Sequence, residues 1–393
     1  MEFMGSFRVK KIILVNYEYP PIGAGAGNAT YHIATALANQ GHVPIVFTSK
    51  FHNNQGFIRE GNVLVYRCLT IRRKQWESNL HEMASFILSG LIFLPRIIRN
   101  QRIDAAIVFF SLPCGPLGLY SHFLFGIPYV ISLRGGDVPG SEPSLNTFHK
   151  LFKLLRHLVL KKSSAVIANS EGLKLLSEKT DPFTVKVIPN GVDIHFFTPI
   201  SKKNIGTKFL FVGRFREQKN IFFLLKQMNI LAGRTKESFE LHLVGDGSLK
   251  KDLQRVTLTL SFKNKIFWHP WCDKKTLREY YQHSDCLINT SYYEGMSNVL
   301  LEAMACGLPV VASNVIGNTT IVKNGETGIL FNLQEPEEFQ KALYYIIHNK
   351  EQARKMGATA RSRVEREFSW DKVAKRYVQS IALPRINKTR KSI

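Results

Sequence analysis

The chain has few acidic residues for its size. Only 30 of its 393 residues are Asp or Glu, against 53 Lys or Arg, which gives a formal net charge of +23. A protein this basic usually has an anionic partner: nucleic acid, a membrane surface or a phosphorylated substrate. No zinc-finger spacing and no aromatic RNA-binding motif accompanies the charge, so we expect no nucleic-acid partner. A diffusely basic, solvated surface is the alternative interpretation.

Cysteines are scarce and recognisable metal motifs are absent. The five cysteines are scattered, odd in number and contain no CxxC pair. This usage predicts neither a disulfide framework nor a zinc site and favours a reducing cytosol. The sequence also lacks DxD and HExxH. We therefore expect no required metal and no cofactor.

Long hydrophobic runs are missing as well. The most apolar segment is Met83 to Leu94, twelve residues that stop before Pro95-Arg96. A helix needs about 20 residues to cross a bilayer, so this segment suits a core helix or an interfacial one. The run Ile12 to Val15 is too short for a signal peptide and has no small-residue cleavage site, which favours a cytoplasmic location.

A strand, turn, helix, strand pattern opens the chain. The apolar run Lys11–Val15 leads into the glycine-rich turn Gly23–Gly27, a helical pattern that ends near Gly41, and a second apolar run, Val43–Phe47. This pattern predicts the first unit of a parallel α/β sheet, with the turn at the carboxyl end of a strand, where such sheets bind ligands.

The glycine turn alone does not predict NAD binding. It reads GxGxG rather than GxGxxG, and no acidic residue closes the second strand at Thr48-Ser49-Lys50. The alternative is that small residues let a phosphate or an acceptor approach the backbone.

The pattern restarts in the second half and predicts two Rossmann-like domains. Apolar runs that suit buried strands recur through both halves. They lie at residues 105–110, 129–133, 165–169 and 186–188, and again at 209–212, 241–244, 266–268, 286–289 and 309–312. We expect domains at 1–199 and 200–367, a last helix at 368–381 and a basic tail at 382–393.

Two cations and two acids stand at predicted strand ends of the second half. Arg214 and Lys219 follow the strand that ends at Val212, and such a pair can bind two phosphates. Glu294 precedes a helix that should begin near Ser297, and Glu302 lies within it. Carboxylates accept hydrogen bonds from vicinal hydroxyls, and amides at the start of a helix attract anions. The alternatives are a solvated basic surface and a carboxylate that merely caps a helix.

A second loop at a strand end lies in the first half. Arg134-Gly135-Gly136-Asp137 follows the strand that ends at Leu133. Asp137 could bind a hydroxyl and Arg134 an anion, with a structural salt bridge as the alternative.

The stretch Lys150–Lys162 is basic and amphipathic. Its leucines recur at helical spacing, and no acid lies between Glu142 and Glu171. This composition is typical of a helix that lies on an anionic bilayer, although a core-packed helix with a basic rim has the same pattern. The candidate membrane contacts are Lys150, Lys153, Arg156, Lys161 and Lys162.

These motifs together resemble the retaining glycosyltransferases of the GT-B fold, family GT4, over nearly the whole chain. The most specific match runs from Glu294 through Glu302 to Val310. The other matching stretches are Gly23–Gly27 with 41–43, 168–171, 189–193, Gly213-Arg214 with Lys219-Asn220, and 245–247.

The resemblance implies an α/β fold of two Rossmann-like, doubly wound domains that face each other across a cleft, with the C-terminal helix crossing back to the first domain. It implies a retaining, metal-independent hexosyltransferase that uses a UDP- or GDP-sugar. The acceptor would be a saccharide or a lipid-linked saccharide in bacterial surface polysaccharide or glycolipid synthesis. The alternatives are a nucleotide-sugar epimerase, a phosphorylase, or a catalytically weak basic protein that binds the inner face of the cytoplasmic membrane.

The resemblance also assigns roles to individual residues. Arg214 and Lys219 would hold the diphosphate, Glu294 the transferred sugar and Glu302 the ribose. Many relatives have a histidine where this chain has Arg134, which makes Arg134 and Asp137 the candidates for that part of the site. The remaining implied donor contacts are Gly23, Gly25, Gly213, Trp271, Gly295, Met296, Ser297, Asn298 and Val299, and Gly27 would face the acceptor.

Overall fold

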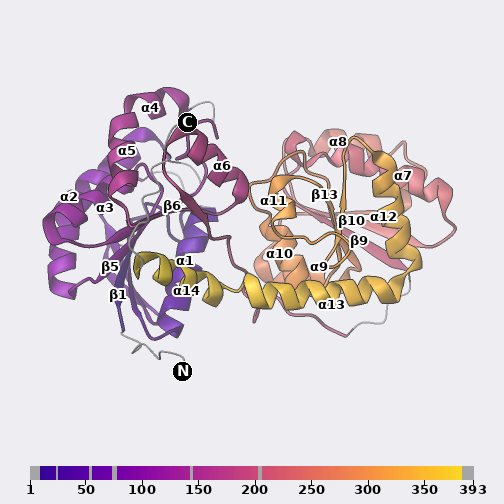
Figure 1. Ribbon diagram of the computed structural model, residues 1–393. Coiled ribbons are helices and arrows are strands. Elements are labelled where there is room, and N and C mark those ends of the chain that lie inside the picture. The colour runs from indigo at the N-terminus through magenta and orange to yellow at the C-terminus, as the bar shows by residue number, and fades with distance from the viewer. Residues whose placement is uncertain are drawn as a thin grey trace, which may run out of the picture. The chain divides into compact units, whose positions relative to one another are not determined.

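The described residues form two compact units (Figure 1). The computed structural model describes residues 9–23, 25–52, 55–72, 78–141, 145–201 and 206–382. One unit contains the described residues up to Asn190 together with those from Trp370 onward, and the other is Gly191–Ser369. The expected domain boundaries at 199 and 367 lie near these unit boundaries but do not coincide with them.

The first unit is built on an eight-stranded sheet with the order β3-β4-β2-β1-β5-β6-β7-β8. Every neighbouring pair is parallel except β3 with β4. The central strands are apolar and fully buried, as a sheet covered on both faces requires. The strands are β1 (Lys11–Val15), β2 (Val43–Ser49), β3 (Gly56–Glu60), β4 (Val63–Cys68), β5 (Ala105–Phe109), β6 (Tyr129–Leu133), β7 (Ala165–Ala168) and β8 (Val185–Val187).

Helices cover both faces of this sheet. Helix α1 (Gly25–Asn39) connects β1 to β2, and α14 (Trp370–Ala382) packs against α1 and β6. The connections from β4 to β8 run along the sheet in the opposite direction, so their helices lie on the other face by the right-handed crossover rule. These helices are α2 (Leu80–Gln101), α3 (Gly115–Phe125), α4 (Asn146–Leu151), α5 (Lys153–Lys162) and α6 (Glu171–Thr180).

Helix α2 is longer than the sequence indicated. We expected its apolar segment to stop at Pro95, but the helix continues through Pro95 to Gln101. A proline inside a helix leaves the carbonyl four residues earlier without its N–H partner. Here that carbonyl belongs to Leu91, and it accepts a hydrogen bond from the Tyr120 hydroxyl of α3 at 3.4 Å. Among the described residues, α2 is the one helix with the length and apolar composition of a membrane span.

The second unit is built on a six-stranded parallel sheet with the order β11-β10-β9-β12-β13-β14. Two apolar cores lie against it, one centred on Phe209, Phe211 and Leu241, the other on Leu210, Leu287 and the apolar side of α10. The strands are β9 (Thr207–Val212), β10 (Phe239–Val244), β11 (Ile266–His269), β12 (Cys286–Asn289), β13 (Val310–Ser313) and β14 (Ile329–Phe331).

The helices of the second unit alternate with its strands. The helix expected from about Asn298 to Cys306 is α10, and Gly307 follows its end with φ +75°, a left-handed conformation that suits glycine. Two short 3-10 turns, Glu217–Lys219 and Lys263–Lys265, complete the unit. Its helices are α7 (Ile221–Arg234), α8 (Lys250–Thr257), α9 (Lys274–His283), α10 (Asn298–Ala305), α11 (Ile316–Thr319), α12 (Pro336–His348) and α13 (Lys350–Glu367).

The cysteines are free thiols divided between the two units. Cys68 and Cys114 are buried in the first unit, and Cys286 and Cys306 are buried in the second. Cys272 is half-buried. Burial raises the pKa of Cys68 to about 12 and raises that of Cys114 as well.

Candidate functional site

An ion pair joins two of the predicted site residues at the carboxyl edge of the second sheet. Lys219 follows β9 and Glu294 follows β12, and these two strands are parallel neighbours. The Lys219 Nζ donates to Glu294 Oε1 at 2.5 Å, and the two side chains are 17% and 8% exposed. The structure therefore brings one predicted cation and one predicted acid into direct contact, with little water around them.

A network of neutral polar side chains holds the Glu294 carboxylate. Glu294 Oε1 also accepts from Ser291 Oγ at 2.7 Å and from Asn289 Nδ2 at 3.3 Å. Behind it, the buried Asn318 donates from Nδ2 to Asn289 Oδ1 at 3.2 Å and to the Ser313 carbonyl at 2.9 Å. These supporting residues fix the position of Glu294, and we did not predict them. The polar run Asn289-Thr290-Ser291 at a strand end was the one available signal.

The loop that carries Lys219 is tied to the loop that carries Glu294. The Gln218 amide donates to the Tyr293 carbonyl at 2.9 Å, and the Tyr292 N–H donates to the Gln218 carbonyl at 2.9 Å. The Thr290 hydroxyl donates to the Lys219 carbonyl at 2.9 Å. Three bonds between residues more than 70 positions apart therefore keep the ion pair in register.

Arg214 stands beside this pair in sequence, and its side chain is exposed. A close approach of two loops fixes its backbone: the Phe215 N–H donates to the Asp246 carbonyl at 2.8 Å, and Gly245 lies against Gly213. Gly245 has φ +148°, and a Cβ there would lie 2.0 Å from the Gly213 carbonyl oxygen, so only glycine fits. Among the described residues, no hydrogen bond or ion pair engages the Arg214 guanidinium.

The start of α10 lies just after Glu294. Gly295, Met296 and Ser297 precede the helix, and Asn298 and Val299 are in its first turn. Ser297 occupies the N-cap position, but its side chain makes no capping hydrogen bond. The positive end of α10 is therefore not neutralised by a side-chain cap.

Glu302 lies on α10 and is half-buried. The buried Tyr281 hydroxyl donates to Glu302 Oε2 at 2.9 Å. Burial raises the pKa of Glu302 to about 7, against which the Tyr281 hydrogen bond acts in the lowering direction. The alternative that Glu302 caps a surface helix is wrong, because it lies in the second turn of α10 among the buried residues Leu301 and Ala303.

A chain of hydrogen bonds lies at the edge strand β11. Glu240 Oε2, His242, His269 and the Tyr280 hydroxyl are linked in that order by contacts of 3.1, 3.0 and 2.9 Å. Burial lowers the pKa of His269, and His242 acts in the same direction. Trp271, two residues after His269, is exposed by 64% and presents a flat apolar ring at this edge.

One cavity of this unit lies away from the predicted site residues. A cavity of about 310 Å³ is lined by Gly206, Asp285 and Pro309, which precede β9, β12 and β13. It therefore opens at the amino edge of the sheet, opposite Glu294, and it does not include the predicted site residues.

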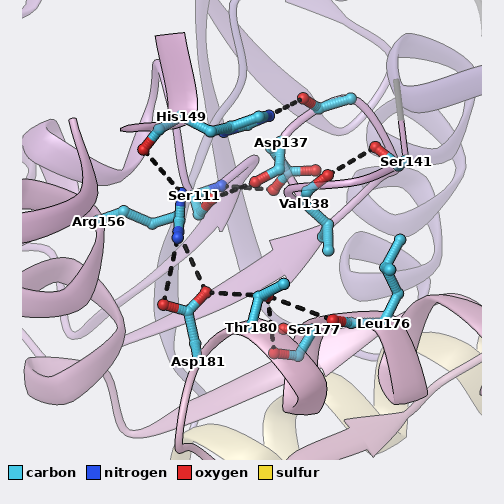
Figure 2. Close-up of polar contacts among 11 residues, drawn as sticks. Ser111, Asp137, Val138, Ser141, His149, Arg156, Leu176, Ser177, Thr180 and Asp181 are labelled. Carbon is cyan, nitrogen blue, oxygen red and sulfur yellow. Dashed lines mark hydrogen bonds and ion pairs between the residues drawn. The ribbon is translucent and has the colours of Figure 1, made fainter. Parts of the chain in front are cut away.

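Asp137 lies in the first unit and has a structural role there (Figure 2). Its carboxylate is buried and accepts from three backbone amides: Ser111 at 2.7 Å, Arg134 at 2.9 Å and Gly135 at 3.1 Å. Burial raises its pKa, while these amides lower it. We expected a substrate hydroxyl on this carboxylate, but its oxygens already hold the loop that follows β6.

The Arg134 guanidinium also has protein partners within the first unit. Its guanidinium donates to Asn190 Oδ1 at 2.8 Å and to the Tyr377 hydroxyl of α14 at 3.2 Å, and it lies over the ring of Phe109. An anion contact by Arg134 stays a prediction, because these protein partners explain its orientation.

The glycine-rich turn connects β1 to α1. Gly23 has φ +85°, Gly25 is the first residue of α1, and Gly27 packs closely on the Ile22 carbonyl. Ala24 lies outside the described residues. Asn16, at the end of β1, donates to Thr30 Oγ1 at 2.7 Å and so holds α1 to the sheet.

One predicted membrane contact is wrong. Arg156 is 3% exposed and pairs with Asp181 through contacts of 3.1 and 3.3 Å (Figure 2). It therefore ties α5 to the end of α6 inside the unit. The other four, Lys150, Lys153, Lys161 and Lys162, are exposed.

The second unit thus presents the exposed Arg214, the largely buried Lys219, an uncapped helix start and two carboxylates at one sheet edge. Cations and helix amides suit a diphosphate, and carboxylates suit sugar hydroxyls. Among the described residues, no group of three or more His, Cys, Asp or Glu side chains is placed to hold a metal ion.

The chain matches two family descriptions in succession. Residues 23–196 match "Glycosyltransferase Family 4" and residues 195–363 match "Glycosyl transferases group 1". The chain belongs to this family, GT4, and is a glycosyltransferase that uses a nucleotide sugar. One relative is the Escherichia coli UDP-Gal:alpha-D-GlcNAc-diphosphoundecaprenol alpha-1,3-galactosyltransferase, 28% identical over 67% of this chain and 71% of that protein.

Solved structures show the same fold. Sucrose-phosphate synthase from Thermosynechococcus elongatus aligns with a TM-score of 0.73 and 22% identity, over 94% of this chain and 98% of that one. Anabaena Alr3699/HepE in complex with UDP-glucose aligns with a TM-score of 0.66 and 17% identity, over 95% and 99%. The predicted α/β, GT-B fold is confirmed, as is the return of the C-terminal helix α14 to α1 of the first unit.

Gly317 offers a test of how strictly Glu294 must be positioned. A Cβ on Gly317, at the start of α11, would lie 2.4 Å from the Glu294 carbonyl oxygen and 2.8 Å from its Cβ. Gly317→Ala is therefore expected to displace Glu294 and to lower transfer by about 10²-fold, the typical effect of a 1 Å misplacement. Steady-state kinetics measure this. Gly233→Ala on α7, where a Cβ meets nothing within 4 Å, is the matched control and should retain full activity.

Proposed function

We propose that this protein transfers a hexose from a UDP-sugar, with retention at the anomeric carbon, to a saccharide or lipid-linked saccharide in bacterial surface glycan synthesis. The observation that carries the proposal is the arrangement at the carboxyl edge of the second sheet. There, the Lys219–Glu294 pair, the exposed Arg214 and the start of α10 follow neighbouring strands.

The chemistry follows from charge. Breaking the anomeric bond leaves negative charge on the departing diphosphate, and preorganised cations lower that barrier most effectively where water is excluded. Lys219 has three N–H donors and uses one on Glu294, so two remain for phosphate oxygens. Arg214 adds a bidentate donor, and the α10 amides add a partial positive charge.

The two carboxylates position the donor at either end of the diphosphate. Glu294 accepts from Lys219, Ser291 and Asn289 through one oxygen, which leaves Oε2 to accept a sugar hydroxyl. Glu302, in its ionised form, accepts the ribose hydroxyls. A Glu294 carboxylate fixed by three donors is a binding group rather than a mobile nucleophile. This favours front-face transfer, in which the leaving phosphate helps to deprotonate the acceptor.

The choice of UDP and of the acceptor is supported by related proteins. The Anabaena structure holds UDP-glucose, and the Escherichia coli relative is named for a UDP-sugar donor and a diphosphoundecaprenol acceptor. A lipid-linked saccharide acceptor is therefore the one we propose for this chain.

Nucleotide binding tests the proposal directly. UDP at about 100 times its Kd should raise the free energy of unfolding by about 2.7 kcal/mol, a shift of roughly 5 °C or more in Tm. GDP should give a smaller shift. Arg214→Ala should weaken UDP binding by about 10- to 100-fold, since it removes a charge-assisted bond. Because Arg214 has no protein partner among the described residues, the Tm without UDP should not change. A Tm that neither nucleotide raises would refute the proposal.

A further inference from the structure

We infer that the outer face of helices α2, α3, α4 and α5 in the first unit docks on an anionic lipid bilayer. These helices form one layer: α2 packs on α3, α3 on α5, and α4 on α5 (Figure 1). We call the solvent side of this layer the α2–α5 face. The inference goes beyond the reaction and does not depend on which donor or acceptor is used.

Large apolar side chains gather on the α2–α5 face. On α2, Ile92 is 70% exposed; on α3, Phe123 is 60% exposed; on α5, Leu154 is 86% exposed. Leu88, Leu124 and Leu151 on the same helices and on α4 are more than half exposed. Single exposed apolar residues are normal, but a cluster across adjacent helices marks an interaction site.

Contacts between neighbouring helices link the surfaces that carry these side chains. The Tyr120 hydroxyl of α3 reaches the Leu91 carbonyl of α2. Phe123, one turn later on α3, lies under the Lys162 ammonium of α5 at 5.8 Å from the ring centroid. The exposed apolar residues of α2, α3 and α5 are therefore carried by helices that pack on one another.

The charges on this face have one sign. The exposed basic residues of the four helices are Arg96, Arg99, Lys150, Lys153, Lys161 and Lys162. The only acidic residue in these helices is Glu82, which is buried and forms the capping box at the start of α2. Each Lys or Arg near an anionic bilayer contributes roughly a fivefold increase in affinity, so six cations with apolar neighbours are the composition of a lipid-docking surface.

The charge pattern also distinguishes among the occupants of the face. A second copy of the chain would bring six cations against six cations, which opposes a symmetric interface. A spanning role for α2 conflicts with its packing, because Phe86, Leu94 and Ile98 are buried in the core and Gly90 lies against Leu117 of α3. The helix therefore lies along the bilayer surface with its apolar outer side chains in the lipid.

Sedimentation with lipid vesicles tests the inference on the full chain. Wild-type protein should sediment with vesicles of phosphatidylglycerol mixed into phosphatidylcholine and stay in the supernatant with phosphatidylcholine alone. Added salt should release much of it, because screening weakens the lysine contribution. The inference would be overturned if the wild-type protein did not sediment with the anionic vesicles, or if it bound neutral vesicles equally well.

Charge reversal at the lysines of the α2–α5 face tests the electrostatic contribution to binding. Replacing Lys150, Lys153, Lys161 and Lys162 with glutamate should lower vesicle affinity by a factor of about one hundred or more. The matched control carries the same charge change at four exposed lysines of the second unit, Lys226, Lys236, Lys251 and Lys263, and should keep most of the binding. Equal losses in the two variants would mean nonspecific charge attraction and would refute the α2–α5 face.

The triple variant Ile92→Gln, Phe123→Gln, Leu154→Gln tests insertion. It should lose the binding that persists at high salt, while its UDP-dependent Tm shift stays unchanged. Retention of that UDP response distinguishes a failed docking surface from a failed donor site. If analytical ultracentrifugation instead finds a dimer that only this variant abolishes, and the wild type does not bind anionic vesicles, the face is an interface between copies and the lipid inference is wrong.

Discussion

Replacing Lys219 with methionine is expected to lower the rate of sugar transfer by about 10²- to 10³-fold, the usual effect of removing one preorganised donor from a developing anion. Methionine keeps the length of the side chain and removes the charge. The loss should appear in kcat more than in KM, because the charge on the diphosphate grows as the anomeric bond breaks. Stopped-time assays of UDP release and of product formation measure both quantities.

The Lys219–Glu294 pair complicates the single variant, because removing one partner leaves the other charge largely enclosed. Such a charge typically costs a few kcal/mol of stability. Glu294→Gln and the double variant Lys219→Met, Glu294→Gln complete the cycle. We expect the double variant to regain stability while remaining inactive, since both charges are then gone. Near-normal turnover in either single variant would remove these residues from the catalytic site.

Donor affinity is expected to fall as pH is lowered through about 7, because Glu302 must be ionised to accept ribose hydroxyls and burial raises its pKa to about 7. One pH unit below that value, the carboxylate is about nine-tenths protonated, so affinity for UDP-glucose should drop about tenfold. Calorimetric titrations from pH 5.5 to 8.5 measure this. Glu302→Gln should bind more weakly at high pH and show no such dependence.

The same carboxylate should make the protein less stable at high pH. Its pKa is raised from an ordinary 4.5, so the folded chain holds a proton between about pH 4.5 and 7 that the unfolded chain has lost. The stabilisation is complete below 4.5 and is lost as pH rises through 7. Glu302→Gln should therefore gain about 1–3 kcal/mol in unfolding free energy at pH 8 and nothing at pH 4.5. Urea unfolding of the wild type and of Glu302→Gln at both pH values measures these free energies.

Tyr281→Phe removes a hydrogen-bond donor to the ionised Glu302 carboxylate. It should therefore shift the pH-dependent loss of stability to higher pH.

The sequence predicted most accurately the parts of the fold that are buried on both sides. Strands β6 and β12 match their expected bounds, because parallel strands covered by helices produce unbroken apolar runs. The edge hairpin β3–β4 and the three-residue β14 were not predicted. Three consecutive residues of β3, Phe57, Ile58 and Arg59, are exposed. The strand therefore shows neither a buried apolar run nor an alternation of buried and exposed residues.

Only part of the candidate site could likewise be predicted from the sequence. Lys219, Glu294 and Glu302 were predicted from their motif. Lys219 follows β9, Glu294 follows β12 and Glu302 lies on α10, as expected where strand ends meet at one edge. Asp137 was predicted to bind a substrate hydroxyl, although its carboxylate accepts from backbone amides. Arg156 was predicted to contact a membrane, although it pairs with Asp181. Which partner a buried charge meets depends on segments distant in sequence. For the same reason Asn318, which supports Glu294 through Asn289, had no local signal.

The buried thiols give each unit its own chemical reporter. Cys68 and Cys114 lie in the interior of one unit and Cys286 and Cys306 in that of the other, and none of them forms a disulfide. A thiol reagent can reach such a side chain only when the packing around it opens, so labelling rates measure opening free energies. Mass spectrometry of the alkylated peptides would therefore assign an opening free energy to each unit separately, from a single sample of native protein with no engineered probe.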